Sequence, residues 1–202
     1  MKSIMDTISQ IHQYRRQLLL LCTLCFSFPA LSLEFNRSES SLHFISIKKN
    51  AIAEVNHFKQ YSVSLNADGT FKLFIDLKSV DTAIEVRNYR LRNFLFEVAR
   101  FPNATVIGHL PPSLYINLTP GQYVRRTLNA NLSLHGMIKK ISANIEIIAL
   151  ADGTLRVSTL QPILLNAKTF GLGNGIKKLA ELAKLDAINT VVPVTFSFSF
   201  KR

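Results

Sequence analysis

The stretch LKSVDTAIEVRNYRLRNFLFEVARFPNATVIGHL, residues 77–110, is the part of the sequence that decides the fold. It continues a strand pattern whose apolar face is formed by Phe71, Leu73, Ile75 and Leu77. A charged, helix-prone segment follows, and a second strand begins after Phe101-Pro102. Polar residues do not converge on one point here, and aromatic residues lie instead among strand and helix. The pattern indicates a protein that holds an apolar molecule rather than one that transforms it.

Alternation of apolar and polar residues recurs along nearly the whole chain beyond residue 32. Three segments show it most clearly, and their apolar positions are Leu128, Ala130, Leu132 and Leu134, then Ile141, Ala143, Ile145 and Ile147, then Val192, Val194, Phe196, Phe198 and Phe200. Such alternation predicts antiparallel strands with one buried face. Turn-forming residues separate the runs at positions 66–69, 111–112, 119–121 and 151–153. We therefore expect an up-and-down barrel of about eight strands.

Two segments break the alternation. Residues 82–99 predict one or two short helices, because Ile84, Leu91 and Leu95 lie among charged residues. Residues 175–185 predict a clearer helix, because its apolar residues form one stripe and its lysines lie opposite. We expect both helical segments to be insertions in a mainly β domain.

The first 32 residues have the layout of a cleavable secretory signal. Two arginines precede an apolar run that Pro29 ends, and small residues follow before the expected cut. The expected mature protein is a single domain, residues 33–202. Both cysteines, Cys22 and Cys25, lie in the signal, so we expect a mature chain without disulfides or thiol nucleophiles.

The chain is strongly basic, with 24 lysines and arginines against 13 aspartates and glutamates, a formal net charge of +11. The basic residues are spread along the sequence in pairs and form no dense basic helix, so we expect no nucleic-acid partner. Transient attraction to anionic lipid headgroups fits this balance better, with plain solubility as the alternative.

No motif for catalysis or metal binding stands out in the sequence. The histidines beyond residue 32 are His43, His57, His109 and His135, and their spacing does not match a metal site. His135 is expected to end a strand, with Gly136 in the following turn. No pair of acidic residues forms an evident acid/base couple. We expect a binding protein rather than an enzyme, with no catalytic residues, no metal and no cofactor.

Several short groups of residues follow one another in a characteristic order: Ser79-Val80-Asp81-Thr82, Arg87-Asn88, Leu91, Phe96, Phe101-Pro102 and Leu132-Ser-Leu-His135-Gly136. With these groups the chain resembles the YceI-like family of secreted lipid-binding β-barrels, over most of residues 38–200. The family often has an acidic residue where Asn88 stands. The resemblance implies a mainly β, antiparallel, lipocalin-like barrel of about eight strands, with one or two short helical insertions. It also implies a bacterial source and hence a periplasmic location.

By resemblance, the ligand is a long-chain apolar lipid of the polyisoprenoid or isoprenoid-quinone type, held in an elongated cavity. The expected lipid-contacting strand residues are Phe71, Leu73, Ile75, Leu132, Leu134, Ile145, Phe196 and Phe198. Around the helical segment, Phe94, Phe96 and Phe101 are expected to line or close one mouth. A polar head would meet Arg87, Arg90 or Arg92, unless these arginines are solvated. The implied function is a periplasmic carrier that sequesters this lipid.

Two other functions stay open from the sequence. The final run VTFSFSF, residues 194–200, resembles the closing strand of an integral outer-membrane barrel, although Lys201-Arg202 follow it and aromatic girdles are lacking. Alternatively, the aromatic residues fill a solid barrel, as in a stress-related structural protein. The oligomeric state is also open, a dimer included.

Overall fold

The computed structural model describes residues 33–49 and 51–202, so the predicted signal peptide lies outside the described residues. Its strands form one antiparallel sheet. The strands are β1 (Glu34–Lys48), β2 (Ile52–Phe58), β3 (Tyr61–Leu65), β4 (Thr70–Asp76), β5 (Val80–Asp81), β6 (Asn103–His109), β7 (Tyr123–Leu134), β8 (Met137–Ala149), β9 (Leu155–Thr159), β10 (Ile163–Asn166) and β11 (Val191–Lys201). The helical elements are the 3-10 turns η1 (Leu77–Ser79), η3 (Pro112–Leu114) and η4 (Ala167–Phe170), the α-helices α2 (Glu85–Arg90) and α3 (Gly173–Leu182), and the π-helical turn η2 (Leu91–Leu95).

The sheet is a meander that curls round until its first strand, β1, pairs with its last, β11. Three pairs of strands are the halves of bent strands: β2 with β3, β4 with β5, and β9 with β10. The bend between β2 and β3 stays bonded to its neighbour, because the amide of Lys59 donates to the carbonyl of Ser79 at 2.9 Å. Counting each pair as one strand leaves eight. The predicted up-and-down, lipocalin-like barrel is confirmed.

The predicted alternation places apolar side chains inside the curled sheet. Leu132, Ile147, Phe198 and Phe200 are all buried, while intervening residues such as Asn131 are exposed. The alternation of apolar and polar residues therefore predicts correctly which face of these strands is turned inward.

The β7–β8 hairpin turns at the predicted position. His135 and Gly136 both have positive φ, 52° and 75°. Such a pair of left-handed residues gives the backbone twist that suits a two-residue hairpin loop. The His135 ring also lies 3.2 Å from the Glu97 carboxylate, which ties the hairpin to the segment after η2.

One end of the barrel is closed by aromatic side chains. Phe35, at the start of β1, contacts the rings of Tyr61, Phe198 and Phe200, with centroid distances of 5.8–6.1 Å. The loop around η3 lies at the same end, and Arg202 donates to the Tyr115 carbonyl of this loop at 2.9 Å. This end is filled with side chains.

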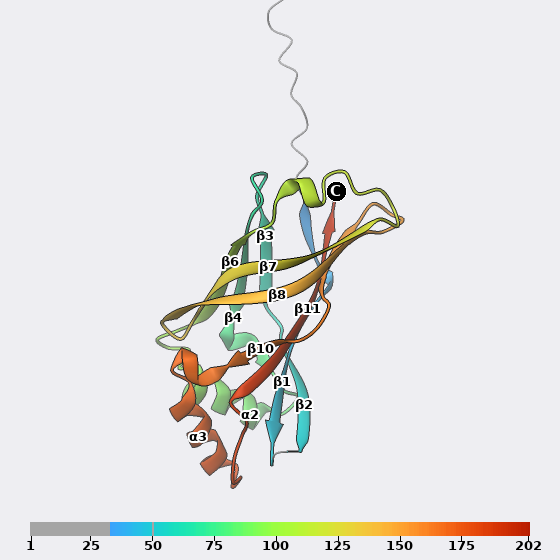
Figure 1. Cartoon of the computed structure of the whole chain (residues 1–202). Coiled ribbons are helices and arrows are strands. Elements are labelled where there is room, and N and C mark those ends of the chain that lie inside the picture. The colour runs from blue at the N-terminus through green and yellow to red at the C-terminus, as the bar shows by residue number, and fades with distance from the viewer. Residues whose placement is uncertain (1–32, 50) are drawn as a thin grey trace, which may run out of the picture. The chain divides into compact units, whose positions relative to one another are not determined.

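The helical elements α2 and α3 lie together at the other end (Figure 1). They are the two predicted helical insertions, although α2 and η2 cover less of residues 82–99 than expected. In residues 33–49 and 51–202, no helix has the length and apolar character needed to cross a bilayer. A close contact joins the two insertions at Gly175, where an added Cβ would lie 2.5 Å from the Phe94 carbonyl oxygen and 2.9 Å from the Leu95 Cα.

We expect Gly175→Ala to lower the free energy of unfolding by roughly 1–3 kcal/mol, because the added methyl group meets backbone atoms that cannot move aside easily. Gly173→Ala is the matched control, since the nearest atom to its Cβ lies at an ordinary 3.6 Å. Chemical denaturation of both variants and the wild type checks the difference. Equal stability of the two variants would contradict the close contact.

Candidate functional site

The barrel encloses a cavity of about 660 Å³, lined almost entirely by apolar side chains. Pockets that bury a small ligand have volumes of roughly 300–1,000 Å³, so this one is large enough to hold a guest molecule. The solid-barrel alternative requires an interior filled with side chains throughout. The cavity shows that this interior is not filled throughout. The cavity reaches the surface at the helical end, where the exposed residues Ile84, Val86, Lys184 and Asn189 contribute to its lining.

Most residues predicted to contact a ligand lie on this cavity. Those that line it are Phe71, Leu73, Ile75, Phe96, Leu132, Leu134, Phe196 and Phe198. They come from β4, β7, β11 and the segment that follows η2. The structure therefore brings together side chains from segments more than 120 residues apart in the sequence.

Three predicted residues do not line the cavity. Ile145 is completely buried, because it faces the inside of the barrel where the core is filled. Phe94 is 38% exposed and packs edge-to-face on Tyr89 outside the cavity. Phe101 packs against the His135 ring, with a centroid distance of 4.4 Å and an angle of 51° between the rings. Their predicted places on the cavity wall and mouth are corrected accordingly.

The sequence reasoning missed the cavity wall formed by β1, β2 and α3. Leu42 and Phe44 of β1 and Phe58 of β2 line the cavity, as do Leu179 and Leu182 of α3. The stripe on α3 was visible as an amphipathic pattern, but that pattern indicates only that a face is buried. What the face is buried against depends on the tertiary structure.

A charged cluster lies at the helical end of the cavity. The Glu54 carboxylate accepts from Lys48 at 2.9 Å and from Arg87 at 2.9 and 3.2 Å. Burial raises the pKa of Glu54, but the hydrogen bond from Lys48 and the charge of Arg87 outweigh it, so the pKa lies below its usual value. Arg90 also lines the cavity, while Arg92 pairs with Glu85 at 2.6 Å on the surface.

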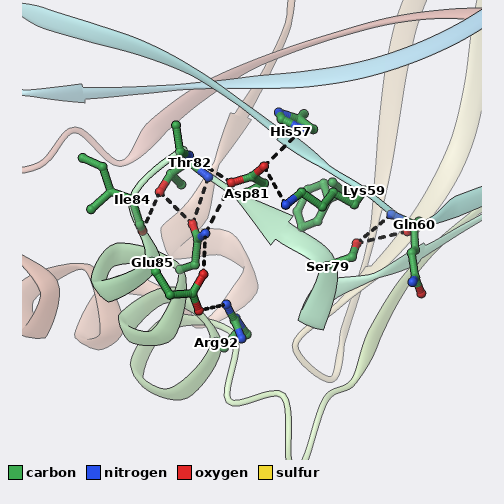
Figure 2. Close-up of polar contacts among 12 residues, drawn as sticks. His57, Lys59, Gln60, Ser79, Asp81, Thr82, Ile84, Glu85 and Arg92 are labelled. Atoms are coloured by element: carbon green, nitrogen blue, oxygen red, sulfur yellow. Dashed lines mark hydrogen bonds and ion pairs between the residues drawn. The ribbon is translucent and has the colours of Figure 1, made fainter.

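A polar network fixes α2 to the barrel at this end. The buried Asn88 accepts at Oδ1 from the amide and the hydroxyl of Thr82, at 2.9 and 2.7 Å. Its Nδ2 donates to Asp81 and Glu85, both at 3.3 Å. Figure 2 shows Asp81 between this network and two residues of the sheet side, His57 in β2 and Lys59 just after it. Because Asp81 lies in β5 and its partner His57 in β2, the network joins the helical insertion to the sheet.

The Asp81 carboxylate is strongly favoured in its charged form. The hydrogen bond from Lys59, then that from the Ala83 amide, lower the pKa of Asp81 to about 2. Lys59 lies 3.0 Å away and the Ala83 amide donates at 3.0 Å. The network therefore keeps its negative charge through the whole physiological range of pH.

The described residues contain no group of three histidines, cysteines or acidic residues placed to hold a metal ion. Among them, His135 pairs with Glu97, and His109 lies 2.9 Å from the Asp68 carbonyl oxygen. His57 lies 3.6 Å from Asp81. Each of these histidines has a local partner that accounts for its position.

Comparison with known proteins agrees with this architecture. A family model described as the YceI-like domain matches residues 33–200. The chain belongs to the YceI-like family. A solved polyisoprenoid binding domain from Saccharophagus degradans is 33% identical to this YceI-like chain, with a TM-score of 0.81, and the match covers 84% of this chain and 98% of that one.

A second solved structure shares the fold of this YceI-like barrel. BcnA from Burkholderia cenocepacia is 16% identical, with a TM-score of 0.65, and the match covers 82% of this chain and 99% of that one. At this identity the likeness concerns the fold alone. A comparison with curated protein sequences gave no match.

The pKa of Asp81 predicts how this YceI-like barrel responds to acid. Because the pKa is lower in the folded state, about 2 against an ordinary 3.8, the charged carboxylate stabilises the fold above about pH 3.8. That stabilisation is lost as the pH falls from about 3.8 to about 2. Asp81→Asn should remove this part of the acid dependence, as measured by denaturation at several pH values. Asn131→Ala, at an exposed residue without a titratable group, is the control and should keep the wild-type profile. An unchanged profile in Asp81→Asn would contradict the assignment.

Proposed function

We propose that this protein binds a long-chain apolar lipid of the polyisoprenoid or isoprenoid-quinone type inside its barrel. The observation that carries the proposal is the apolar cavity of about 660 Å³, closed by aromatic residues at one end and open at the helical end. The polyisoprenoid binding domain from Saccharophagus degradans, with which the chain shares 33% identity over almost that whole domain, supports the same ligand class.

The binding energy would come from burial of the lipid tail. Each methylene transferred from water to an apolar site contributes about 0.8 kcal/mol. A cavity wall such as that formed by Leu73, Leu132 and Phe196 offers few polar groups that could recognise a sugar, nucleotide or peptide. A tail can therefore bind tightly by burial alone, which suits a carrier that must accept and release a lipid without chemical change.

We further propose that the protein acts as a periplasmic carrier and exchanges its lipid at membranes through the helical end. Four large apolar side chains are exposed there, Ile84, Val86, Tyr89 and Phe94, at 44, 56, 56 and 38%. Exposed lysines accompany them on and after α3: Lys177, Lys178 and Lys184. An apolar tip with basic residues around it suits transient docking on an anionic bilayer.

The outer faces of the strands favour this function over the integral outer-membrane alternative. Arg125, Asn129, Asn144 and Glu146 lie side by side on the outside of β7 and β8. A barrel that spans a membrane requires an apolar band at such positions. Arg125 and Glu146 are instead paired at 2.8 Å in contact with water.

Ala130→Phe should abolish lipid binding, because Ala130 lines the cavity and the larger ring occupies the space of the tail. Native mass spectrometry of freshly purified protein, before and after addition of a long-chain isoprenoid, measures the bound lipid. Asn131→Phe is the control, since the neighbouring residue is exposed on the outer face and its variant should still bind. Wild-type protein that neither copurifies with lipid nor binds added isoprenoid would refute the proposal.

Val86→Glu combined with Tyr89→Glu should slow lipid transfer between vesicles that contain anionic lipid by about fivefold or more, because each added charge is repelled by the bilayer surface. A fluorescent lipid transferred from donor to acceptor vesicles provides the measurement. Ile116→Glu serves as control, because this exposed residue lies near the closed end of the barrel. Equal slowing by the control would contradict docking through the helical end.

A further inference from the structure

The inner face of the β1–β2 hairpin changes from charged to apolar towards the middle of the barrel. The cross-strand pairs, from the hairpin tip inward, are Lys48 with Ile52, Ser46 with Glu54, and Phe44 with Asn56. Asn56 is the innermost polar residue of this series and is only 1% exposed. It lines the cavity together with Ser46, at the point where the polar end meets the apolar interior.

The orientation of the Asn56 amide is determined by its partners. Its Nδ2 donates to the Ser46 hydroxyl at 3.1 Å and to the Glu54 backbone carbonyl at 3.0 Å. Because a carbonyl oxygen can only accept, the amide nitrogen must face Glu54. Its Oδ1 is buried and has no hydrogen-bond partner among the described residues.

A buried acceptor without a partner is unfavourable, and the Asn56 side chain that carries it lines the cavity that we propose holds a ligand. The Ser46 hydroxyl accepts from Asn56 and keeps its own hydrogen, for which the described part of the chain shows no acceptor. Asn56 and Ser46, which are joined by their own hydrogen bond, thus leave one acceptor and one donor without a partner at the cavity wall. A hydroxyl group, which donates one hydrogen bond and accepts another, is the complement of such a pair.

We propose that Asn56 and Ser46 form a head-group site that selects lipids ending in a hydroxyl group, such as a polyprenol or a quinol. A lipid with the same tail but no donor, such as an ether or a quinone, leaves the Asn56 Oδ1 unpaired. This inference rests on the proposed function, because it requires the tail to occupy the cavity. The head then lies near the β1–β2 hairpin, with the tail extending towards Phe196 and Phe198.

Geranylgeraniol and its methyl ether test this site, because they share one tail and one head-group oxygen and differ in the donor. Wild-type protein stripped of lipid should bind the alcohol about tenfold more tightly than the ether, the usual effect of leaving one buried acceptor unpaired. Competition with a fluorescent lipid measures both affinities. Equal affinities, or tighter binding of the ether, would overturn the head-group site while leaving lipid binding intact. Failure of both probes to bind would overturn the proposed function together with the site.

Asn56→Leu should abolish the preference by weakening the alcohol towards the affinity of the ether, because no acceptor remains to be satisfied. Asn189→Leu is the matched control: this second asparagine lines the cavity mouth, but its Oδ1 already accepts from the Val191 amide at 2.8 Å. It should keep the wild-type ratio. A tenfold preference that survives in Asn56→Leu would overturn the role of Asn56. If Asn56→Leu does not fold, the comparison of the two probes on wild-type protein still decides the proposal.

Discussion

The pairing of β1 with β11 is the constraint on which the cavity and its mouth depend, since it converts a meander into a wall that surrounds a space. The register between these strands shifts between Asn36 and Ser41, and side chains repair the interruption. The Ser40 hydroxyl accepts from the Ser199 amide at 2.9 Å, in place of a backbone partner. Arg37, in the same bulge, donates to the Lys59 carbonyl at 3.0 Å and lies over the Tyr61 ring, which ties β1 to the bend between β2 and β3. The bulge thus lets β1 pair with β11 and also contact the bend between β2 and β3.

The two ends of the enclosed space differ because different elements cover them. Aromatic rings on the ends of β1 and β11, with the loop around η3, fill one end with side chains. Helices cover the other end, where the cavity reaches the surface and is lined by residues of α2, α3 and the β1–β2 hairpin. The helical end also carries nearly all the polar groups that the cavity offers, from Glu54 to Asn56. A lipid with a polar head therefore has one favourable direction in this barrel.

The residues that carry the family resemblance include those that hold the helical end in place. Asp81, Thr82 and Asn88 are bonded to one another, so their joint presence in the sequence reflects one network. The amide of Asn88 both accepts from Thr82 and donates to two carboxylates, which an acidic residue at this position could not do in its charged form. Asparagine at position 88, where the family often has an acidic residue, thus holds α2 on the sheet through hydrogen bonds rather than through an additional ion pair.

The sequence by itself determined the class of fold and the inward face of each strand, because alternation is a local property of strands and reports burial directly. It also located both helical insertions and the turn at Gly136. Only the tertiary structure decided which inward residues border empty space: Leu134 and Ile145 follow the same pattern on paired strands, yet one lines the cavity and the other is packed in the filled core. The unpaired Oδ1 of Asn56 was equally invisible, because a free hydrogen-bonding atom exists only once all neighbouring partners have been placed.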